Sequence, residues 1–156
     1  MNKKQNSKQK IQKLAENDAR PERAIQPTEL LNDTLRRIFG CELADATQKQ
    51  VYRALCISVR ELLTEKNRVF CNCCAEKERK EVYYMSMEFL VGTSLRNNLF
   101  NLGLEAEFRK ALADAGFDID EIYAIDPDAG LGNGGLGRLA SCYMDAATGM
   151  DYPMTG

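Results

Sequence analysis

Residues 130–137 form a segment whose composition suits anion binding: five of the eight residues are glycine, and a helical pattern follows at once. Glycine lets backbone N–H groups approach a ligand without a Cβ in the way. The first N–H groups of a helix also lack partners within that helix and carry a partial positive charge. A glycine loop that opens a helix therefore favours binding of an anion, most simply a phosphate.

The glycines are also compatible with two alternatives to an anion site. The first is a tight turn that packs closely on the following helix, although each glycine costs roughly 0.5–1 kcal/mol relative to alanine in an ordered element. The second is dinucleotide binding, because Gly132, Gly134 and Gly137 have the spacing G-x-G-x-x-G. The context argues against a dinucleotide site, since Asp126-Pro127-Asp128 precedes the loop in place of a β-branched strand.

The chain contains no histidine, which restricts the acid–base chemistry that it can perform. Histidine is the side chain whose ordinary pKa suits proton transfer near neutral pH. The proton donor or acceptor would therefore be a carboxylate with a shifted pKa, a cofactor, a bound phosphate, or a residue that this chain does not contain.

The cysteine cluster Cys71-Asn72-Cys73-Cys74 raises the question of a metal site. Structural zinc is normally held by two pairs of ligands, and the remaining cysteines, Cys41, Cys56 and Cys142, are isolated. We therefore expect no metal. Because no export signal is visible, we expect reduced thiols that pack or are incidental.

The elements that would position the glycine loop can be predicted from periodicity and capping signals. Residues 28–39 have helical spacing and end before Gly40, and residues 47–63 form the clearest amphipathic helix, with a capping-box spacing from Thr47 to Gln50. A polar connector carrying the cysteine cluster follows. Residues 82–87 then favour a short, largely buried strand.

Two further helical stretches are expected to end at Gly103 and Gly116. A brief apolar segment, residues 119–125, precedes the turn at 126–128 and the glycine loop. The predicted fold class is α/β with a helix-rich start. Residues 1–27 are predicted to be a loosely ordered basic leader, and residues 28–156 one incomplete domain.

Composition and charge narrow the class of protein. The apolar fraction of 44% and the charged fraction of 28% are ordinary for globular proteins. Residues 1–30 hold seven Lys/Arg against four Asp/Glu, which is too dilute to predict nucleic-acid binding. No stretch reaches the roughly 18 apolar residues of a membrane helix, and no signal peptide is visible. We expect a cytoplasmic protein without a nucleic-acid or membrane partner.

Two blocks of the sequence resemble the glycogen and maltodextrin (α-1,4-glucan) phosphorylase family. Residues 128–142 are similar to the signature glycine loop of that family nearly residue for residue, and residues 82–92 resemble its early strand at the expected distance upstream. Weaker similarity extends over roughly residues 30–156 and excludes the leader. The resemblance implies the N-terminal, Rossmann-like half of a two-domain glycosyltransferase of the GT-B type.

The resemblance also implies phosphorolysis, in which inorganic phosphate cleaves the terminal α-1,4 bond of a glucan and releases glucose 1-phosphate. The implied cofactor is pyridoxal 5'-phosphate, whose phosphate group exchanges protons with the substrate phosphate. That chemistry suits a chain without histidine, because a phosphate with its second pKa near 6 exchanges protons near neutrality. The family further implies a homodimer.

By the same resemblance, the N–H groups of Gly134 and Gly135 would face the substrate and cofactor phosphates, and that of Leu136 would lie near the glucosyl unit. Asn133 would belong to the same phosphate- and substrate-binding loop. Glu88 matches a carboxylate at the edge of the catalytic cleft and is the candidate catalytic residue, with a structural ion pair as the alternative.

The sequence departs from the family at a few positions. Leu90 stands where some members have a tyrosine that contacts the cofactor, and Thr93 stands where arginine is common. The leader has no counterpart of the regulatory serine region of animal enzymes. The cofactor lysine of the family lies well beyond residue 156, so we expect an N-terminal fragment that is inactive alone. A fragment of a dinucleotide-dependent oxidoreductase and a non-catalytic helical interaction module remain the alternatives.

Overall fold

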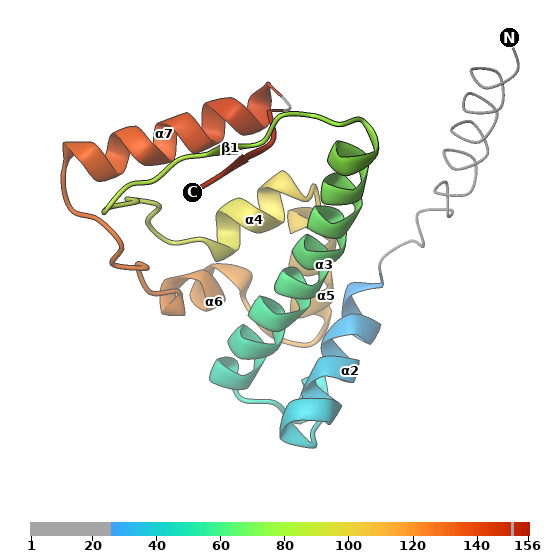
Figure 1. The fold of residues 1–156 in the computed structure, drawn as a ribbon. Helices are drawn as coiled ribbons and strands as arrows, with labels where there is room; N and C mark the ends of the chain where they lie inside the picture. Colours follow the sequence, from blue (N-terminus) through green and yellow to red (C-terminus); the bar gives the residue numbers. More distant parts are fainter. Residues whose placement is uncertain (1–25, 151) are drawn as a thin grey trace, which may run out of the picture.

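A computed structural model describes residues 26–150 and 152–156, and places them in a cluster of helices with a thinner layer beside it. The cluster contains α2 (Pro27–Phe39), the short 3-10 helix η1 (Leu43–Asp45), α3 (Gln48–Glu76), α4 (Leu95–Asn101), α5 (Glu105–Asp114) and α6 (Ile119–Ile125). The layer consists of α7 (Gly135–Gly149) with the strands β1 (Val82–Tyr83) and β2 (Met154–Thr155). In Figure 1, α7 and β1 run together above the cluster. The predicted leader lies, except for its last two residues, outside the described part.

The helix α2 begins and ends where its sequence predicts. Pro27 stands in its first turn, where the missing N–H costs nothing. Gly40 closes the helix with φ of 68°, and its N–H donates to the carbonyl of Arg36. Glycine is suited to this left-handed position because it has no Cβ.

The helix α3 confirms the predicted capping box but not the predicted length. Thr47 accepts from the N–H of Gln50, and the Gln50 side chain accepts from the N–H of Thr47. The helix then continues to Glu76, so the predicted polar connector is wrong and the cysteine cluster lies on the helix. Residues 64–76 contain neither glycine nor proline, so nothing stops the helix where its apolar stripe ends.

The strand prediction at residues 82–87 is correct in place but wrong in extent and burial. Only Val82 and Tyr83 pair, in parallel with Met154 and Thr155. Val82 is 46% exposed and Tyr83 is 68% exposed. Aromatic and β-branched residues favour strands, but burial depends on what packs on the strand. Within the described residues, β1 pairs with a single short strand, β2.

Glycines mark the ends of the next two helices, as predicted. Gly103 follows α4 with φ of 70°, and Gly116 follows α5 with φ of 84°. The brief apolar segment after Gly116 is also helical: the side chain of Asp118 accepts from the N–H of Asp120 and caps α6. A side-chain oxygen at this position satisfies a donor that the helix itself leaves unpaired.

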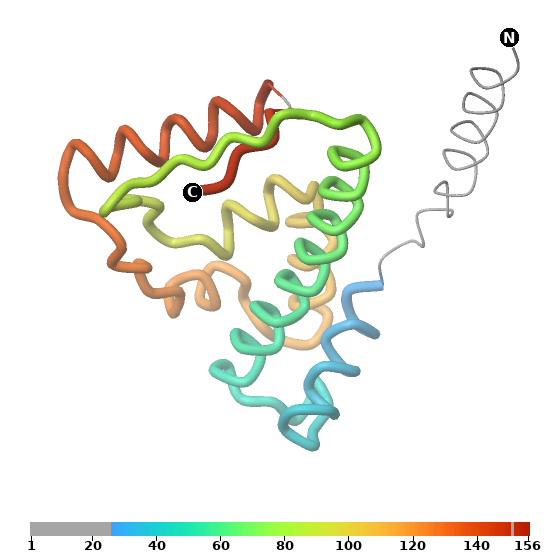
Figure 2. Tube along the Cα trace, in the orientation of Figure 1, coloured from blue at the N-terminus to red at the C-terminus, as the bar shows by residue number. Residues whose placement is uncertain are grey.

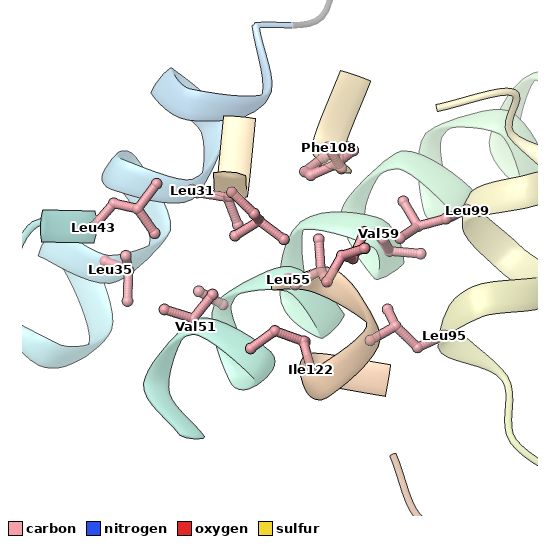
Figure 3. Close-up of a cluster of buried hydrophobic side chains, with 13 residues drawn as sticks. Leu31, Leu35, Leu43, Val51, Leu55, Val59, Leu95, Leu99, Phe108 and Ile122 are labelled. Atoms are coloured by element: carbon pink, nitrogen blue, oxygen red, sulfur yellow. The ribbon is translucent and has the colours of Figure 1, made fainter. Parts of the chain in front are cut away.

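The hydrophobic core lies between α2, α3 and the shorter helices α4 to α6. In Figure 3, side chains from all five helices and from η1 point toward one another. The core consists of Leu31, Leu35, Leu43, Val51, Ala54, Leu55, Val59, Leu95, Leu99, Phe108, Leu112, Ile119 and Ile122. The hydroxyls of Thr34 and Ser58, both buried, lie 3.2 Å apart and satisfy each other between α2 and α3.

The layer containing α7 is held together by the chain that follows β1. In Figure 2 this segment runs along α7 before it turns back toward α4. The ring of Tyr84 meets those of Phe89 and Tyr143 edge to face, with centroids 6.2 and 5.8 Å apart. None of the helices in the described ranges is long and apolar enough to cross a membrane. The fold is helix-rich with a small parallel sheet.

Candidate functional site

The glycine loop is anchored at its base by the carboxylate of Asp126. One oxygen, Oδ2, accepts from the N–H groups of Ser94 and Leu95 at 3.0 and 2.9 Å, where α4 begins. The other, Oδ1, accepts from the hydroxyl of Tyr52 on α3 at 2.9 Å. Burial, with smaller contributions from Cys56 and Asp126, raises the pKa of Tyr52, so the hydroxyl stays protonated and donates. The loop therefore starts from a fixed point on the helical cluster.

A second carboxylate shapes the turn that follows. The N–H of Gly130 donates to Oδ1 of Asp128 at 3.0 Å. Gly130 has φ of 65°, which an L side chain rarely adopts. This turn sends the chain from α6 toward the start of α7, on the side where Figure 1 shows the loop rising to that helix.

The segment 88–90 lies directly against the loop, and two glycines make this approach possible. The N–H of Phe89 donates to the carbonyl of Leu131 at 2.8 Å, and that of Leu90 donates to the carbonyl of Gly137 at 3.0 Å. A Cβ on Gly132 would lie 3.0 Å from the Leu90 nitrogen, and one on Gly137 would lie 3.2 Å from it. These two glycines are therefore required by packing.

The carboxylate of Glu88 faces the loop amides. Its Oε2 accepts from the N–H of Gly134 at 3.3 Å and from that of Asn133 at 3.5 Å. The same oxygen would lie 3.1 Å from a Cβ on Gly137. Within the described residues, no ion pair to Glu88 is formed. The carboxylate thus lies at the N-terminus of α7, where the helix dipole favours negative charge.

The first turn of α7 leaves N–H groups available beside this carboxylate. The first helical bond is donated by Arg138 to the carbonyl of Gly134. In the part of the chain that the structure describes, the N–H groups of Gly135, Leu136 and Gly137 have no acceptor. Gly137 is buried, whereas Gly135 and Leu136 are exposed, Leu136 by 74%. Two unpaired donors at an exposed helix start can bind an anion.

Gly135 differs from its neighbours because nothing in the fold accounts for it. A Cβ at this position would meet no atom within 4 Å, and its φ is not positive. Neither close packing nor backbone conformation requires glycine there. A bare backbone at an exposed helix start instead suits a ligand that comes close to the main chain.

The structure brings together every residue that the sequence predicts for the site: Glu88, Asn133, Gly134, Gly135 and Leu136. It also shows two residues that were not predicted there, Asp126 and Tyr52, which fix the base of the loop. The sequence signal for Asp126 was present, because aspartate before a turn often accepts from backbone N–H groups. No local signal linked it to Tyr52, which lies far away in the sequence.

The remaining candidate sites have simpler surroundings. Cys71 is exposed and Cys74 is buried on α3, and the six cysteines are free. Among residues 26–150 and 152–156, no three His, Cys, Asp or Glu side chains are arranged to hold a metal. The element before the glycine loop is the helix α6, which disagrees with the strand that a dinucleotide-binding turn requires.

Comparison with known sequences agrees with the resemblance. The sequence model of the family described as carbohydrate phosphorylase matches residues 112–156, which include the whole loop and α7. Glycogen phosphorylase from Chlamydia trachomatis is 40% identical over 111 residues, which cover 71% of this chain. This chain belongs to the carbohydrate phosphorylase family. The resemblance found in the two sequence blocks is therefore confirmed.

Other members of the phosphorylase family show similar agreement. Glycogen phosphorylase from Synechocystis is 38% identical over 130 residues, or 81% of this chain. Alpha-glucan phosphorylase 1 from Arabidopsis thaliana is 49% identical over 77 residues, or 49% of this chain. The matched segments correspond to only 14%, 15% and 8% of the lengths of the three relatives named.

Proposed function

We propose that this chain forms the phosphate-binding glycine loop of an α-1,4-glucan phosphorylase, which cleaves glycogen with inorganic phosphate and releases glucose 1-phosphate. The observation that carries the proposal is the exposed start of α7, where Gly135 is bare without a packing reason and two exposed N–H groups are unpaired. The membership of the phosphorylase family gives this anion site its chemical context.

Each residue of the site has a role in the proposal. The N–H groups of Gly135 and Leu136 bind the substrate phosphate and the neighbouring glucosyl unit, and Asn133 and Gly134 complete the loop. Because these donors are fixed by the helix before the ligand arrives, they stabilise phosphate charge without reorganising. We also propose that Glu88 belongs to the edge of this site, and its hydrogen bond from the N–H of Gly134 supports this.

The family resemblance implies pyridoxal phosphate as the cofactor, and the residues present fit its phosphate group. An exposed helix start with unpaired N–H groups suits a phosphate, and we propose that Gly134 and Gly135 lie near it. When bound, the cofactor supplies a phosphate whose second pKa near 6 allows proton exchange near neutrality. The role of this chain is to orient the anions and to stabilise their negative charge.

The remaining proposals concern the larger enzyme. We propose that residues 28–156 are the start of the N-terminal, Rossmann-like domain of a two-domain glycosyltransferase of the GT-B type. A cytoplasmic homodimer acting on α-1,4-glucan and phosphate is the assembly that the family supports. The parallel pairing of β1 with β2 agrees with an α/β domain.

A chimaeric enzyme tests the proposal. The segment of the Chlamydia trachomatis glycogen phosphorylase that matches this chain is replaced by the corresponding residues of this chain, and glucose 1-phosphate formation from glycogen and phosphate is measured. We expect the chimaera to be active. We also expect Gly135→Ala in the chimaera to lower kcat/KM about tenfold or more. Alanine keeps the backbone N–H, but its Cβ would stand where the phosphate approaches and would weaken the hydrogen bond to that donor, and a weakened phosphate donor has this order of effect.

Gly149→Ala is the matched control, because Gly149 also lies in α7 and a Cβ there would meet nothing within 4 Å. This control should keep the activity of the parent chimaera. A folded chimaera in which Gly135→Ala and Gly149→Ala have equal activity would refute the role of Gly135.

A further inference from the structure

We propose that Glu88 makes the site selective for tetrahedral anions that carry a proton, so that it binds phosphate and rejects sulfate. The inference rests on the proposed function, because it takes phosphate as the ligand of the α7 start. It assigns Glu88 a role in choosing the anion, beyond a general place at the edge of the cleft.

The position of the carboxylate carries the first step. Its Oε2 lies 3.3 Å from the nitrogen of Gly134, the residue immediately before the two exposed, unpaired donors of α7. An anion bound to the N–H groups of Gly135 and Leu136 would therefore have the Glu88 carboxylate as its neighbour. The site then combines backbone donors with a neighbouring negative charge.

The main chain around Glu88 is held in place. The hydroxyl of Ser86 donates to the carbonyl of Glu88 at 2.9 Å and accepts from the N–H of Glu88 at 3.3 Å. The next two residues along the chain are hydrogen-bonded to the carbonyls of Leu131 and Gly137. The backbone of Glu88 is therefore held in a fixed position against the glycine loop.

The two oxygens of the Glu88 carboxylate differ in their hydrogen-bond partners. Within the described residues, Oε2 accepts the loop amides, whereas Oε1 has no hydrogen-bond donor and no cation beside it. An ionised carboxylate can only accept hydrogen bonds. A ligand beside Oε1 therefore binds better when it can donate a hydrogen bond to this oxygen. It binds less well when it places an unprotonated, negatively charged oxygen there.

Phosphate and sulfate differ in this property. Near neutral pH phosphate keeps at least one proton, because its last proton is lost only at strongly alkaline pH, and that P–OH group can donate to Oε1. Sulfate is fully ionised and offers only acceptors, so its oxygen would face the carboxylate with like charge. A site built to accept a hydrogen bond strongly rejects analogues that lack the donor.

Amide NMR titrations of the full 156-residue chain test this inference. Phosphate, arsenate and sulfate are added separately at neutral pH and constant ionic strength, and the shifts of the Gly135 and Leu136 amides give each dissociation constant. We expect phosphate and arsenate to bind about tenfold or more tightly than sulfate, as for a charge-assisted hydrogen bond. In Glu88→Gln the preference should fall to about twofold or less.

Glu107→Gln is the matched control, because it removes one negative charge from an exposed position on α5 and should keep the preference. Comparable binding of phosphate and sulfate to the unmodified chain would overturn the selectivity of Glu88 and leave the proposed phosphate site intact. So would a preference that persists in Glu88→Gln. No anion-dependent shift at Gly135 or Leu136 in any of the chains would instead overturn the phosphate site itself.

Discussion

Different positions in the loop are glycine for different physical reasons. Gly130 is required by a positive φ, and Gly132 is required because the backbone of Leu90 passes within 3.0 Å of the place of its Cβ. Gly135 meets neither condition, since the space around its missing Cβ is open. The first two therefore serve the fold, and the third is free to serve a ligand.

This difference gives a prediction at the scale of single residues. Gly132→Ala should lower the free energy of unfolding by about 1–3 kcal/mol, because the new methyl group meets backbone atoms that cannot move cheaply. Gly135→Ala should leave it unchanged or raise it by up to about 1 kcal/mol, because alanine restricts the unfolded chain and fits the helix. Urea unfolding followed by circular dichroism measures both.

The two variants serve as controls for each other, because both add one methyl group to the same loop. Equal stabilities of the two would contradict the packing argument. A large loss of stability in Gly135→Ala would mean that its glycine is structural after all.

At the scale of elements, Asp126 links three helices through one side chain. It ends α6, accepts from the first N–H groups of α4 and receives the hydroxyl of Tyr52 from α3. Oxygens that cap a helix from a distance replace the missing acceptors at its start. The base of the glycine loop is thereby tied to the hydrophobic core.

We expect Asp126→Asn to destabilise the chain by about 1–3 kcal/mol, because an amide has a single acceptor oxygen and leaves at least one donor near α4 or Tyr52 unpaired. The measurement is again the free energy of unfolding. Asp114→Asn, an exposed carboxylate at the end of α5, should have little effect. If the two substitutions cost the same, Asp126 does not anchor the loop.

Local signals in the sequence predicted the helices well. The end of α2 at Gly40 and the start of α3 at Thr47 follow from capping, which depends on residues only a few positions apart. The length of α3 was underestimated because its last turns lack an apolar stripe yet contain no helix breaker. The burial of β1 was overestimated because it depends on partners that local sequence does not reveal.

The sequence singled out candidate residues for the site but could not predict how they are arranged. The glycine spacing and the family resemblance singled out Gly134, Gly135 and Leu136, and the structure places them at the start of a helix. That Glu88 lies on the amides of Asn133 and Gly134 could not be predicted, because these contacts join segments more than forty residues apart. The anchor between Asp126 and Tyr52 is hidden for the same reason.

At the scale of the whole molecule, apolar side chains gather on the layer that contains α7. Met85 and Met87 are almost fully exposed on the segment after β1, and Leu136, Leu139 and Tyr143 are exposed on α7. Single exposed apolar residues are ordinary, but several on adjoining elements form a surface that favours association.

We expect the chain to self-associate through this surface, and Met87→Glu to weaken the association by removing apolar area and adding charge. Sedimentation velocity over a range of concentrations measures the effect. Ile38→Glu is the matched control, since Ile38 is exposed on α2 and the change in net charge is the same. Equal weakening by both variants would show that charge alone, and not this surface, controls association.

The pairing of Val82 with Met154 has a consequence for the order of folding. It joins two points of the chain that are separated by α4, α5, α6 and α7. The pairing therefore closes a long loop but forms only a few hydrogen bonds. Closing a long loop is slow compared with forming helices and nearby contacts. During synthesis on the ribosome, the helical cluster should therefore assemble first, and the two strands should join it as a late step after residue 155 has been added.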